Sequence, residues 1–484
     1  MVSLSSAAGR LGALVRAHRP FAIVLAVGAV VRVVAMLGYT PALWFNDSYD
    51  YVRIGLDPFA HPIRPVGYGI WLWVLKPFHS FALVAGLQHL MGLAIGVMIY
   101  ALLRRRGLPG WGAVLAAVPV LLDGNQIQLE QVILSDTLFE FLVITAVVLV
   151  LWRTPSVWMC AAAGLLLAAA TLTRTIGLPV LLIALGVLAF QRVGWRRPAA
   201  LAVAGLLPLP LYAGWFHAEN GTYAISVTDG IFLWGRTAAF ADCEKIKPSP
   251  DLAGLCPVGE PGHRRSSSTQ IWNTDDPNPL GWAPGQVFTA EQNDRAQRFA
   301  LEAIKTQPLD YVQAVSYDLF VRTFSPVRAK YPTPYVVDGY TFLKHPQHQP
   351  KWNVYKGGTP TETIQAYEHG SARTRTHEPF ATMVRGYQQV VALPGTALAV
   401  VLLVPFGVWA RQRRRPDSAV ALPWLTSTAL LVVPPVTTDF DYRYVVVAVP
   451  FACLAAGLAC VRGRGRPALD DDAERTAREP APAS

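Results

Sequence analysis

The sequence predicts an all-α protein that crosses a membrane about ten times, and three observations support this. First, 52% of the 484 residues are hydrophobic and 15% are charged, whereas a soluble chain carries about 25% charged residues. Second, the mean hydropathy is +0.32, and apolar runs of roughly 18–22 residues recur along the chain. Third, the net charge of +10 comes from short basic clusters between these runs. Such clusters set orientation in a membrane, so nucleic acid is not an expected partner.

The apolar runs form two groups, one before and one after a long polar region. The first run follows several arginines and has no small-residue cleavage site, which predicts a retained helix rather than a signal peptide. The runs cover about 21–37, 80–103, 111–122, 129–152, 157–172, 176–190, 199–216, 382–409, 419–436 and 445–461. The shorter, tryptophan-rich segment 66–78 fits a helix that lies in the membrane interface.

This pattern divides the chain into four parts. They are an N-terminal transmembrane module of about seven spans (1–218, with a first outer loop at 38–79), a loop domain (219–380), C-terminal transmembrane helices (381–462) and a disordered tail (463–484). The loop domain is expected to be α-rich or mixed. Thr289 and Gln292 have the spacing of a helix capping box, and Pro308 is placed to open a second helix. The sequence does not predict the fold of 219–285.

The basic clusters also predict how the protein sits in the membrane. With ten spans they all fall on one side, which is therefore cytosolic. The clusters are Arg10, Arg16 and Arg19; Arg104, Arg105 and Arg106; Arg153; Arg192, Arg196 and Arg197; Arg411, Arg413, Arg414 and Arg415; and Arg462, Arg464 and Arg466. Both termini are then cytosolic, and the loop domain lies outside the cytoplasmic membrane.

The cysteines test the same orientation. Cys160, Cys453 and Cys460 fall inside apolar runs, where cysteine is a small packing residue. Cys243 and Cys256 lie in the loop domain. If that domain is extracytoplasmic, a disulfide between them is expected. The alternative is a pair of free thiols in a cytosolic loop.

Polar residues gather at the predicted outer ends of four spans. They are Asp47, Asp50, His61 and Arg64 in the first loop; Glu130 and Asp136; Arg174; and the run from Asp439 to Tyr444 that contains Tyr442 and Arg443. Ionisable groups at membrane depth are costly, which favours a functional role. We expect these groups to converge on one outward cavity that holds both acids and cations.

This mixture favours sugar transfer from a lipid-linked donor. Nucleotide sugars are cytosolic, so a sugar used outside would arrive on a polyprenyl phosphate, and arginine binds phosphate well. A carboxylate can deprotonate the acceptor hydroxyl. Asp47 and Asp50 of the first loop are the candidates for this base. The simpler alternatives are arginines that anchor lipid headgroups, an Asp136 that complements a helix dipole, and a structural His61.

Five segments carry a resemblance to a known family. They are Asp47-Ser48-Tyr49-Asp50-Tyr51, Ile63-Arg64-Pro65-Val66-Gly67-Tyr68, Leu134-Ser135-Asp136-Thr137-Leu138-Phe139, Thr171-Leu172-Thr173-Arg174-Thr175-Ile176-Gly177 and Asp441-Tyr442-Arg443-Tyr444 with Pro450. In this order they resemble the motifs of the glycosyltransferase C superfamily, near the lipid A aminoarabinose transferases and the protein O-mannosyltransferases. The resemblance covers about residues 20–190 and 430–455 and does not extend to the loop domain.

The resemblance implies an inverting transfer from a polyprenyl-phosphate sugar to a glycan, lipid or protein acceptor. It implies Asp47 as the base. The implied donor-phosphate ligands are Arg64, Arg174, Arg443 and Tyr442, with Asp136 and Glu130 as cavity acids. Ser48 stands where the family has a second acidic residue, so a divalent metal is not favoured, although Asp50 is placed to compensate. No other cofactor is expected, and membrane lipid is an expected partner.

Two other classes of protein remain open from the sequence. A transporter or flippase would usually show an inverted repeat or a matched pair of broken helices, and neither is evident. A polymerase like the O-antigen ligases would need catalytic Arg or His residues in the large loop. The candidates for that role are His263, Arg264 and Arg265.

Overall fold

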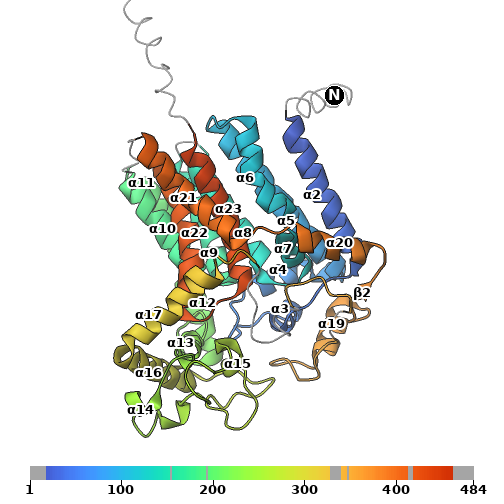
Figure 1. Ribbon diagram of the computed structural model, residues 1–484. Coiled ribbons are helices and arrows are strands. Elements are labelled where there is room, and N and C mark those ends of the chain that lie inside the picture. The colour runs from blue at the N-terminus through green and yellow to red at the C-terminus, as the bar shows by residue number, and fades with distance from the viewer. Residues whose placement is uncertain are drawn as a thin grey trace, which may run out of the picture.

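The computed structural model describes residues 18–152, 155–191, 194–327, 339–345, 348–412 and 418–461. Figure 1 shows a bundle of long helices, with a smaller helical unit at the end opposite the start of α2. The predicted tail at 463–484 lies outside the described residues. So do Arg10, Arg16, Arg153, Arg192, Arg413, Arg414, Arg415, Arg462, Arg464 and Arg466 of the basic clusters.

Within the described residues, six helices are long and apolar enough to cross a membrane. They are α2 (Arg19–Gly38), α5 (Phe81–Arg105), the continuous pair α11 and α12 (Arg196–Leu206 and Pro208–Asn220), α21 (Gly395–Gln412), α22 (Ser418–Thr437) and α23 (Tyr442–Ala459). Shorter apolar helices accompany them: α6 (Gly110–Leu122), α9 (Val157–Thr173) and α10 (Gly177–Phe190). The protein is therefore a helical membrane protein, and the number of ten spans stays a prediction.

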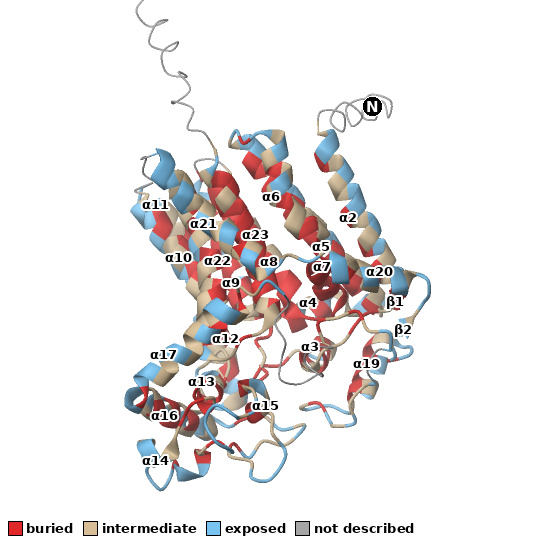
Figure 2. Cartoon of the chain, viewed as in Figure 1, coloured by how far each residue is buried: buried red, intermediate tan, exposed pale blue. Residues whose placement is uncertain are grey.

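Exposure of apolar side chains on the outer helices supports a membrane setting. In α21 only 6% of the residues are buried, whereas 78% are buried in α23. Val400, Leu403 and Phe406 of α21 are exposed. Figure 2 shows the buried residues concentrated around α7 (Gly124–Gln131), α8 (Ser135–Leu151) and α23. Large apolar side chains that point outward from a helix bundle are expected where lipid, not water, surrounds the protein.

Two predicted spans are each broken into two helices. The run 129–152 divides into α7 and α8, because Val132 leaves the helix to form a β-bridge with Leu43. The run 382–409 divides into α20 (Phe380–Val390) and α21. Pro394 lies in the second break, and the backbone N–H of Leu393 donates to the Asp123 carboxylate over 2.7 Å. The residues at the two breaks, Val132-Ile133-Leu134 and Val391-Ala392-Leu393, are themselves apolar, so each predicted run continued across its break.

The segment 66–78 forms α4 (Gly67–Leu75) followed by the 3-10 turn η1 (Lys76–Phe78). Ile70, Trp73 and Phe78 are exposed on it. Helix α3 (Asn46–Leu56) lies between α2 and α4 in the chain and packs on α4. The first loop is thus a helical layer beneath the bundle rather than an open connection.

We call the described part of residues 219–380 the outer domain; apart from the two-residue strand β2 (Arg375–Thr376), its regular structure is helical. Its elements are α13 (Asp229–Ala238), α14 (Cys243–Ile246), η2 (Ala253–Leu255), α15 (Ser267–Ile271), α16 (Ala290–Thr306), α17 (Pro308–Ser316), η3 (Tyr317–Arg322) and α19 (Pro360–Glu368). The predicted α-rich character is confirmed. So are the Thr289–Gln292 capping box and the opening of α17 at Pro308.

The outer domain has its own core, an internal disulfide and a strand pairing with the first loop. Trp234 of α13 and Phe299 of α16 are fully buried at its centre. The predicted disulfide joins Cys243 to Cys256. The short strand β2 (Arg375–Thr376) pairs antiparallel with β1 (Tyr39–Thr40), where α2 ends. This pairing ties the end of the outer domain to the first loop.

Candidate functional site

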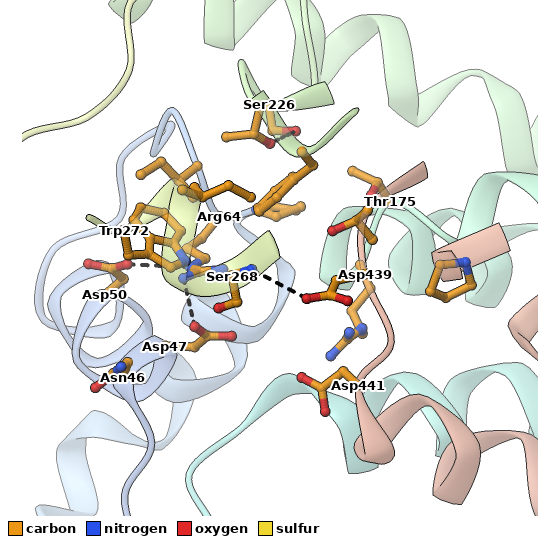
Figure 3. Close-up of a pocket in the computed structure, with 18 of the residues that line it drawn as sticks. Asn46, Asp47, Asp50, Arg64, Thr175, Ser226, Ser268, Trp272, Asp439 and Asp441 are labelled. Atoms are coloured by element: carbon orange, nitrogen blue, oxygen red, sulfur yellow. Dashed lines mark hydrogen bonds and ion pairs between the residues drawn. The ribbon is translucent and has the colours of Figure 1, made fainter. Parts of the chain in front are cut away.

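A cavity of about 1010 Å³ lies between the helix bundle and the outer domain. Its described lining comes from α3 and the following loop, from the starts of α8, α10 and α23, from the end of α22, and from the outer domain. Of the eight residues given catalytic, phosphate-binding or cavity-acid roles from the sequence, it contains six: Asp47, Asp50, Arg64, Asp136, Arg174 and Arg443. Figure 3 shows Arg64 beside Asp47 and Asp50, with Asp439 and Asp441 across the cavity. Segments that are far apart in the sequence therefore meet in this cavity, as predicted from the polar residues at the ends of four spans.

Helix α3 carries the two acids of the first loop. Asp47 and Asp50 are three residues apart, so they share one face of the helix. Ser48 is fully buried, and its hydroxyl accepts a hydrogen bond of 2.9 Å from the backbone N–H of Phe45, the residue before the helix. Ser48 therefore fixes the start of α3 instead of facing the cavity.

Arg64 joins both acids of α3. Its Nη2 donates to Asp47 Oδ1 over 2.6 Å, and its Nε donates to Asp50 Oδ2 over 3.3 Å. His61 supports the loop that carries Arg64. Its Nδ1 accepts from the backbone N–H groups of Ile63 and Arg64, at 3.0 and 3.1 Å. His61 thus has a structural role in the loop, and burial, Arg64 and Lys356 together hold its pKa well below the usual value.

Two further arginines extend this pairing toward the bundle. Arg443, in the first turn of α23, donates from Nη1 to Asp47 Oδ2 over 2.9 Å, and the same nitrogen lies 3.9 Å from Asp136. Arg174, at the end of α9, forms an ion pair of 2.6 Å with Asp136. The guanidinium groups of Arg174 and Arg443 lie over the ring of Tyr444, at 5.1 and 5.4 Å from its centre, respectively. The aromatic ring helps to hold the two cations side by side.

The result is a continuous chain of alternating charges. It runs Asp50–Arg64–Asp47–Arg443–Asp136–Arg174, and each neighbouring pair is linked by one of the contacts above. We call these six residues the charge chain. Its three carboxylates and three guanidinium groups carry equal and opposite charge, and Asp441 adds a fourth carboxylate 3.1 Å from Arg443. Such pairing allows ionised groups to lie together away from bulk water. An anion that entered the cavity would compete with the carboxylates for the guanidinium groups.

The two acids of α3 differ in their affinity for protons. Burial would raise the pKa of Asp47, but the guanidinium groups of Arg64 and Arg443 outweigh it, and the net pKa is lowered. Burial raises the pKa of Asp50 to about 6; Arg64 opposes this shift, and the charge of Asp47 adds to it. In this arrangement Asp47 is the more strongly ionised acid, and Asp50 titrates close to neutral pH.

Glu130 and Tyr442 are not part of this cavity, contrary to the sequence prediction. Glu130 is fully buried inside the bundle and binds Arg32 over 2.7 Å and His89 over 2.8 Å. The hydroxyl of Tyr442 accepts from Asn125 over 3.2 Å, and its side chain lines a separate small cavity. Consecutive helix residues point about 100° apart, so Tyr442 turns away from the cavity that Arg443 enters.

The residues that would serve a ligase-like polymerase also lie elsewhere. Arg264 donates to the backbone carbonyls of Ala238, Ala241 and Gly259, so it supports the outer domain. Arg265 forms an exposed ion pair with Asp275. Among the described residues that line the cavity, none of His263, Arg264 and Arg265 appears. The structure therefore gives no support to that alternative.

The outer domain also contributes to the cavity, which was not predicted from the sequence. The short helix α15 reaches into it, and the backbone N–H of Ser268 donates to Asp439 Oδ2 over 3.3 Å (Figure 3). Burial, together with the charge of Asp318, raises the pKa of Asp439 to about 6, against the opposing effect of Arg236 and Arg322. Trp272 and Trp282 line the same side. Two tryptophans in an otherwise polar stretch were the feature of the sequence that could have indicated this part of the cavity.

Comparison with known proteins finds no matching family model, no matching curated protein and no matching solved structure. Within the described part of the chain there is also no group of three or more His, Cys, Asp or Glu side chains arranged to hold a metal ion. The class that fold and site define is a helical membrane protein with a large cavity containing paired acids and arginines at one end of the bundle. The functional argument rests on that cavity.

Proposed function

We propose that the protein is a membrane glycosyltransferase that moves one sugar from a polyprenyl-phosphate donor to an acceptor outside the cytoplasmic membrane. The observation that carries the proposal is the charge chain in a cavity whose two sides differ. The bundle side has apolar groups beside the three arginines, and the outer-domain side is polar and aromatic. A lipid-linked phosphate and a water-soluble acceptor need such a pair of environments.

The donor would be held by its phosphate and its prenyl chain. Arg64, Arg174 and Arg443 present guanidinium groups, which bind phosphate oxygens through paired hydrogen bonds and stay charged at all relevant pH values. Apolar residues from α8, α10, α22 and α23 line the cavity beside them: Phe139, Ile176, Pro179, Leu430, Val433 and Val447. These side chains suit the first isoprene units of a carrier whose remaining length lies in the membrane.

Donor binding would also free the catalytic base. In the structure both oxygens of Asp47 accept from guanidinium groups, one from Arg64 and one from Arg443. A phosphate placed between those arginines competes for the same donors. Asp47 would then lose its two partners and become more basic when a donor is present.

The reaction then follows from the positions of these groups. The acceptor oxygen forms a bond to the anomeric carbon while the bond from that carbon to the phosphate oxygen breaks. The electron pair of the broken bond stays on the carrier phosphate, where the arginines balance its charge. The acceptor proton passes to Asp47, and attack opposite the phosphate inverts the anomeric centre. Asp50 is the competing base, since it lies on the same face of α3.

Features of the described chain support an orientation with this cavity outside and both termini in the cytosol. Arg104, Arg105 and Arg106 follow the end of α5, and that end of the bundle also holds the start of α2 (Figure 1). The outer domain lies at the opposite end and contains the Cys243–Cys256 disulfide. Basic connections favour the cytosolic side, and disulfides persist outside the cytosol.

The experiment that tests this function is a deletion strain in which envelope glycans are analysed by mass spectrometry. Loss of one defined sugar residue is expected, and it should be restored by the natural gene but not by Asp47→Asn. Asp275→Asn is the matched control, because Asp275 is an exposed outer-domain acid that pairs with Arg265. An unchanged glycan profile in the deletion strain, or full restoration by Asp47→Asn at equal protein level, would contradict the proposal.

A further inference from the structure

The outer-domain side of the cavity has an aromatic wall. Trp272 and Trp282 line it and pack edge to face, with ring centres 5.1 Å apart at 76°. Phe288 holds Trp272 from behind at 5.7 Å. Trp352 also lines the cavity and packs on Tyr49 of α3 at 5.7 Å. These rings are half-buried and fixed by their neighbours, so a ligand can pack on them without ordering them first.

The polar groups on this side are almost all neutral. Hydroxyl and amide side chains line it, namely Ser226, Thr228, Ser268, Thr269, Gln286 and Gln297. Among the described outer-domain residues of the lining there is one carboxylate, Asp229, and no Lys, Arg or His. The three arginines of the cavity all come from the first loop and the bundle. Cations and neutral polar groups are therefore segregated to opposite sides.

This segregation indicates the chemistry of the second ligand. An anionic acceptor, such as a phospholipid headgroup or a phosphate-containing polymer, would need cations where the outer domain offers none. A lipid acceptor would pack on the apolar side chains of this side but would leave its hydroxyl and amide groups without hydrogen-bond partners. A sugar ring has an apolar C–H face that packs on aromatic rings and a rim of hydroxyls that bond to neutral polar groups.

We infer that the outer-domain side of the cavity is a binding subsite for a neutral oligosaccharide, which serves as the acceptor. Trp272 and Trp282 supply the packing surface, and Gln297 and its polar neighbours bind hydroxyls. Trp272 and Ser268 line the same cavity as Arg64 and Asp47, and the backbone N–H of Ser268 donates to Asp439, two residues before the Asp441 that pairs with Arg443. A sugar on Trp272 would thus lie close to the charge chain, where its terminal hydroxyl can reach Asp47. The inference rests on the proposed function, and it narrows the acceptor to the glycan class.

The test measures binding, not transfer. The full chain in lipid nanodiscs, without donor, is presented with a panel of neutral oligosaccharides of three to six pentose or hexose units. Matched panels of unmodified peptides and of anionic lipids serve for comparison. Saturation-transfer NMR then gives dissociation constants for the best ligands. Saccharide binding is expected, and Trp272→Ala should weaken it by at least about tenfold, which corresponds to about 1.4 kcal/mol.

The controls separate loss of binding from loss of folding. Tyr223→Ala is the matched control, because Tyr223 is an exposed outer-domain aromatic away from the cavity lining, and it should bind within about twofold of the natural protein. If Trp272→Ala does not fold, Gln297→Leu carries the test. Loss of that amide removes a hydrogen bond to the ligand and should weaken binding by at least about threefold, which corresponds to about 0.7 kcal/mol.

The outcomes distinguish this inference from the proposed function. Absence of saccharide binding, binding unchanged in the folded variants, or preferential binding of peptides or anionic lipids would overturn the subsite. If transfer still depends on Asp47, the proposed function then stands alone. Saccharide binding that depends on Trp272, in a protein whose glycan transfer does not depend on Asp47, would overturn the proposed function and leave the subsite intact.

Discussion

The choice between Asp47 and Asp50 as the base can be decided by combining two substitutions with a pH profile. We expect Asp47→Asn to lower the turnover rate by about 10²–10⁴-fold, the usual contribution of a positioned general base. The donor KM should stay the same or fall, because a neutral amide no longer competes with the donor phosphate for Arg64 and Arg443. Asp50→Asn should have a smaller effect, about tenfold or less, through the position of Arg64.

The pH dependence gives an independent answer. A base must be deprotonated to act. Asp50 has a pKa of about 6, so with Asp50 as the base the rate would halve near pH 6 and fall about tenfold for each further unit of acidity. The pKa of Asp47 is lowered below its ordinary value of 3.8. With Asp47 as the base, the rate at donor concentrations well below the KM, which follows the pKa values of the donor-free protein, should therefore stay nearly level from pH 8 down to about pH 5.

The assay is single-turnover transfer in lipid nanodiscs from pH 4.5 to 8, with the donor identified by the glycan analysis. Retention of more than about a tenth of the natural rate by Asp47→Asn would refute the role of Asp47. An acid limb near pH 6 that disappears in Asp50→Asn would assign the base to Asp50 instead. Thermal unfolding of both variants controls for damage to the charge chain.

Three further predictions concern the donor, the core and the outer domain. Arg174→Lys should raise the donor KM about tenfold with little change in turnover, since lysine keeps the charge but loses the paired hydrogen bonds; an unchanged KM in steady-state kinetics would remove Arg174 from the phosphate site. Glu130→Ala should destabilise the protein by about 3–5 kcal/mol, because it leaves the buried Arg32 without its carboxylate partner. Thermal unfolding in detergent measures this. A melting temperature within about 1–2 °C of the natural value, roughly the scale of a neutral surface change, would contradict it. Cys243→Ser should lower the free energy of unfolding of the outer domain by about 3 kcal/mol, because the disulfide joins cysteines that are 13 positions apart in the chain. Limited proteolysis should then cut that domain sooner than in the natural protein. Equal cleavage rates would contradict this prediction.

Helical class, membrane setting and much of the site could be predicted because they depend on local composition. Apolar runs and the scarcity of charge indicate helices in lipid wherever the chain is finally packed. Spans of similar length bring their outer ends to one level, so Asp47, Arg64 and Arg174 could be assigned to one cavity without knowledge of the packing. The disulfide followed from two cysteines in one polar region.

The direction in which each side chain points could not be predicted, because it depends on how the helices are rotated relative to one another. Glu130 and Asp136 lie six residues apart, yet the break at Val132 turns Glu130 inward to Arg32 while Asp136 faces Arg174. Neighbours in the sequence diverge in the same way on α23, where Arg443 enters the cavity and Tyr442 does not.

By itself the sequence determined that this is a helical membrane protein with acids and arginines at one end of its bundle, since hydropathy and charge are properties of each segment alone. Only the tertiary structure decided that three carboxylates and three arginines alternate in a single chain of contacts, and that Trp272 and Ser268 of the outer domain line the same cavity. Ion pairs and aromatic walls act over a few ångströms, so they exist only once segments hundreds of residues apart have been brought together.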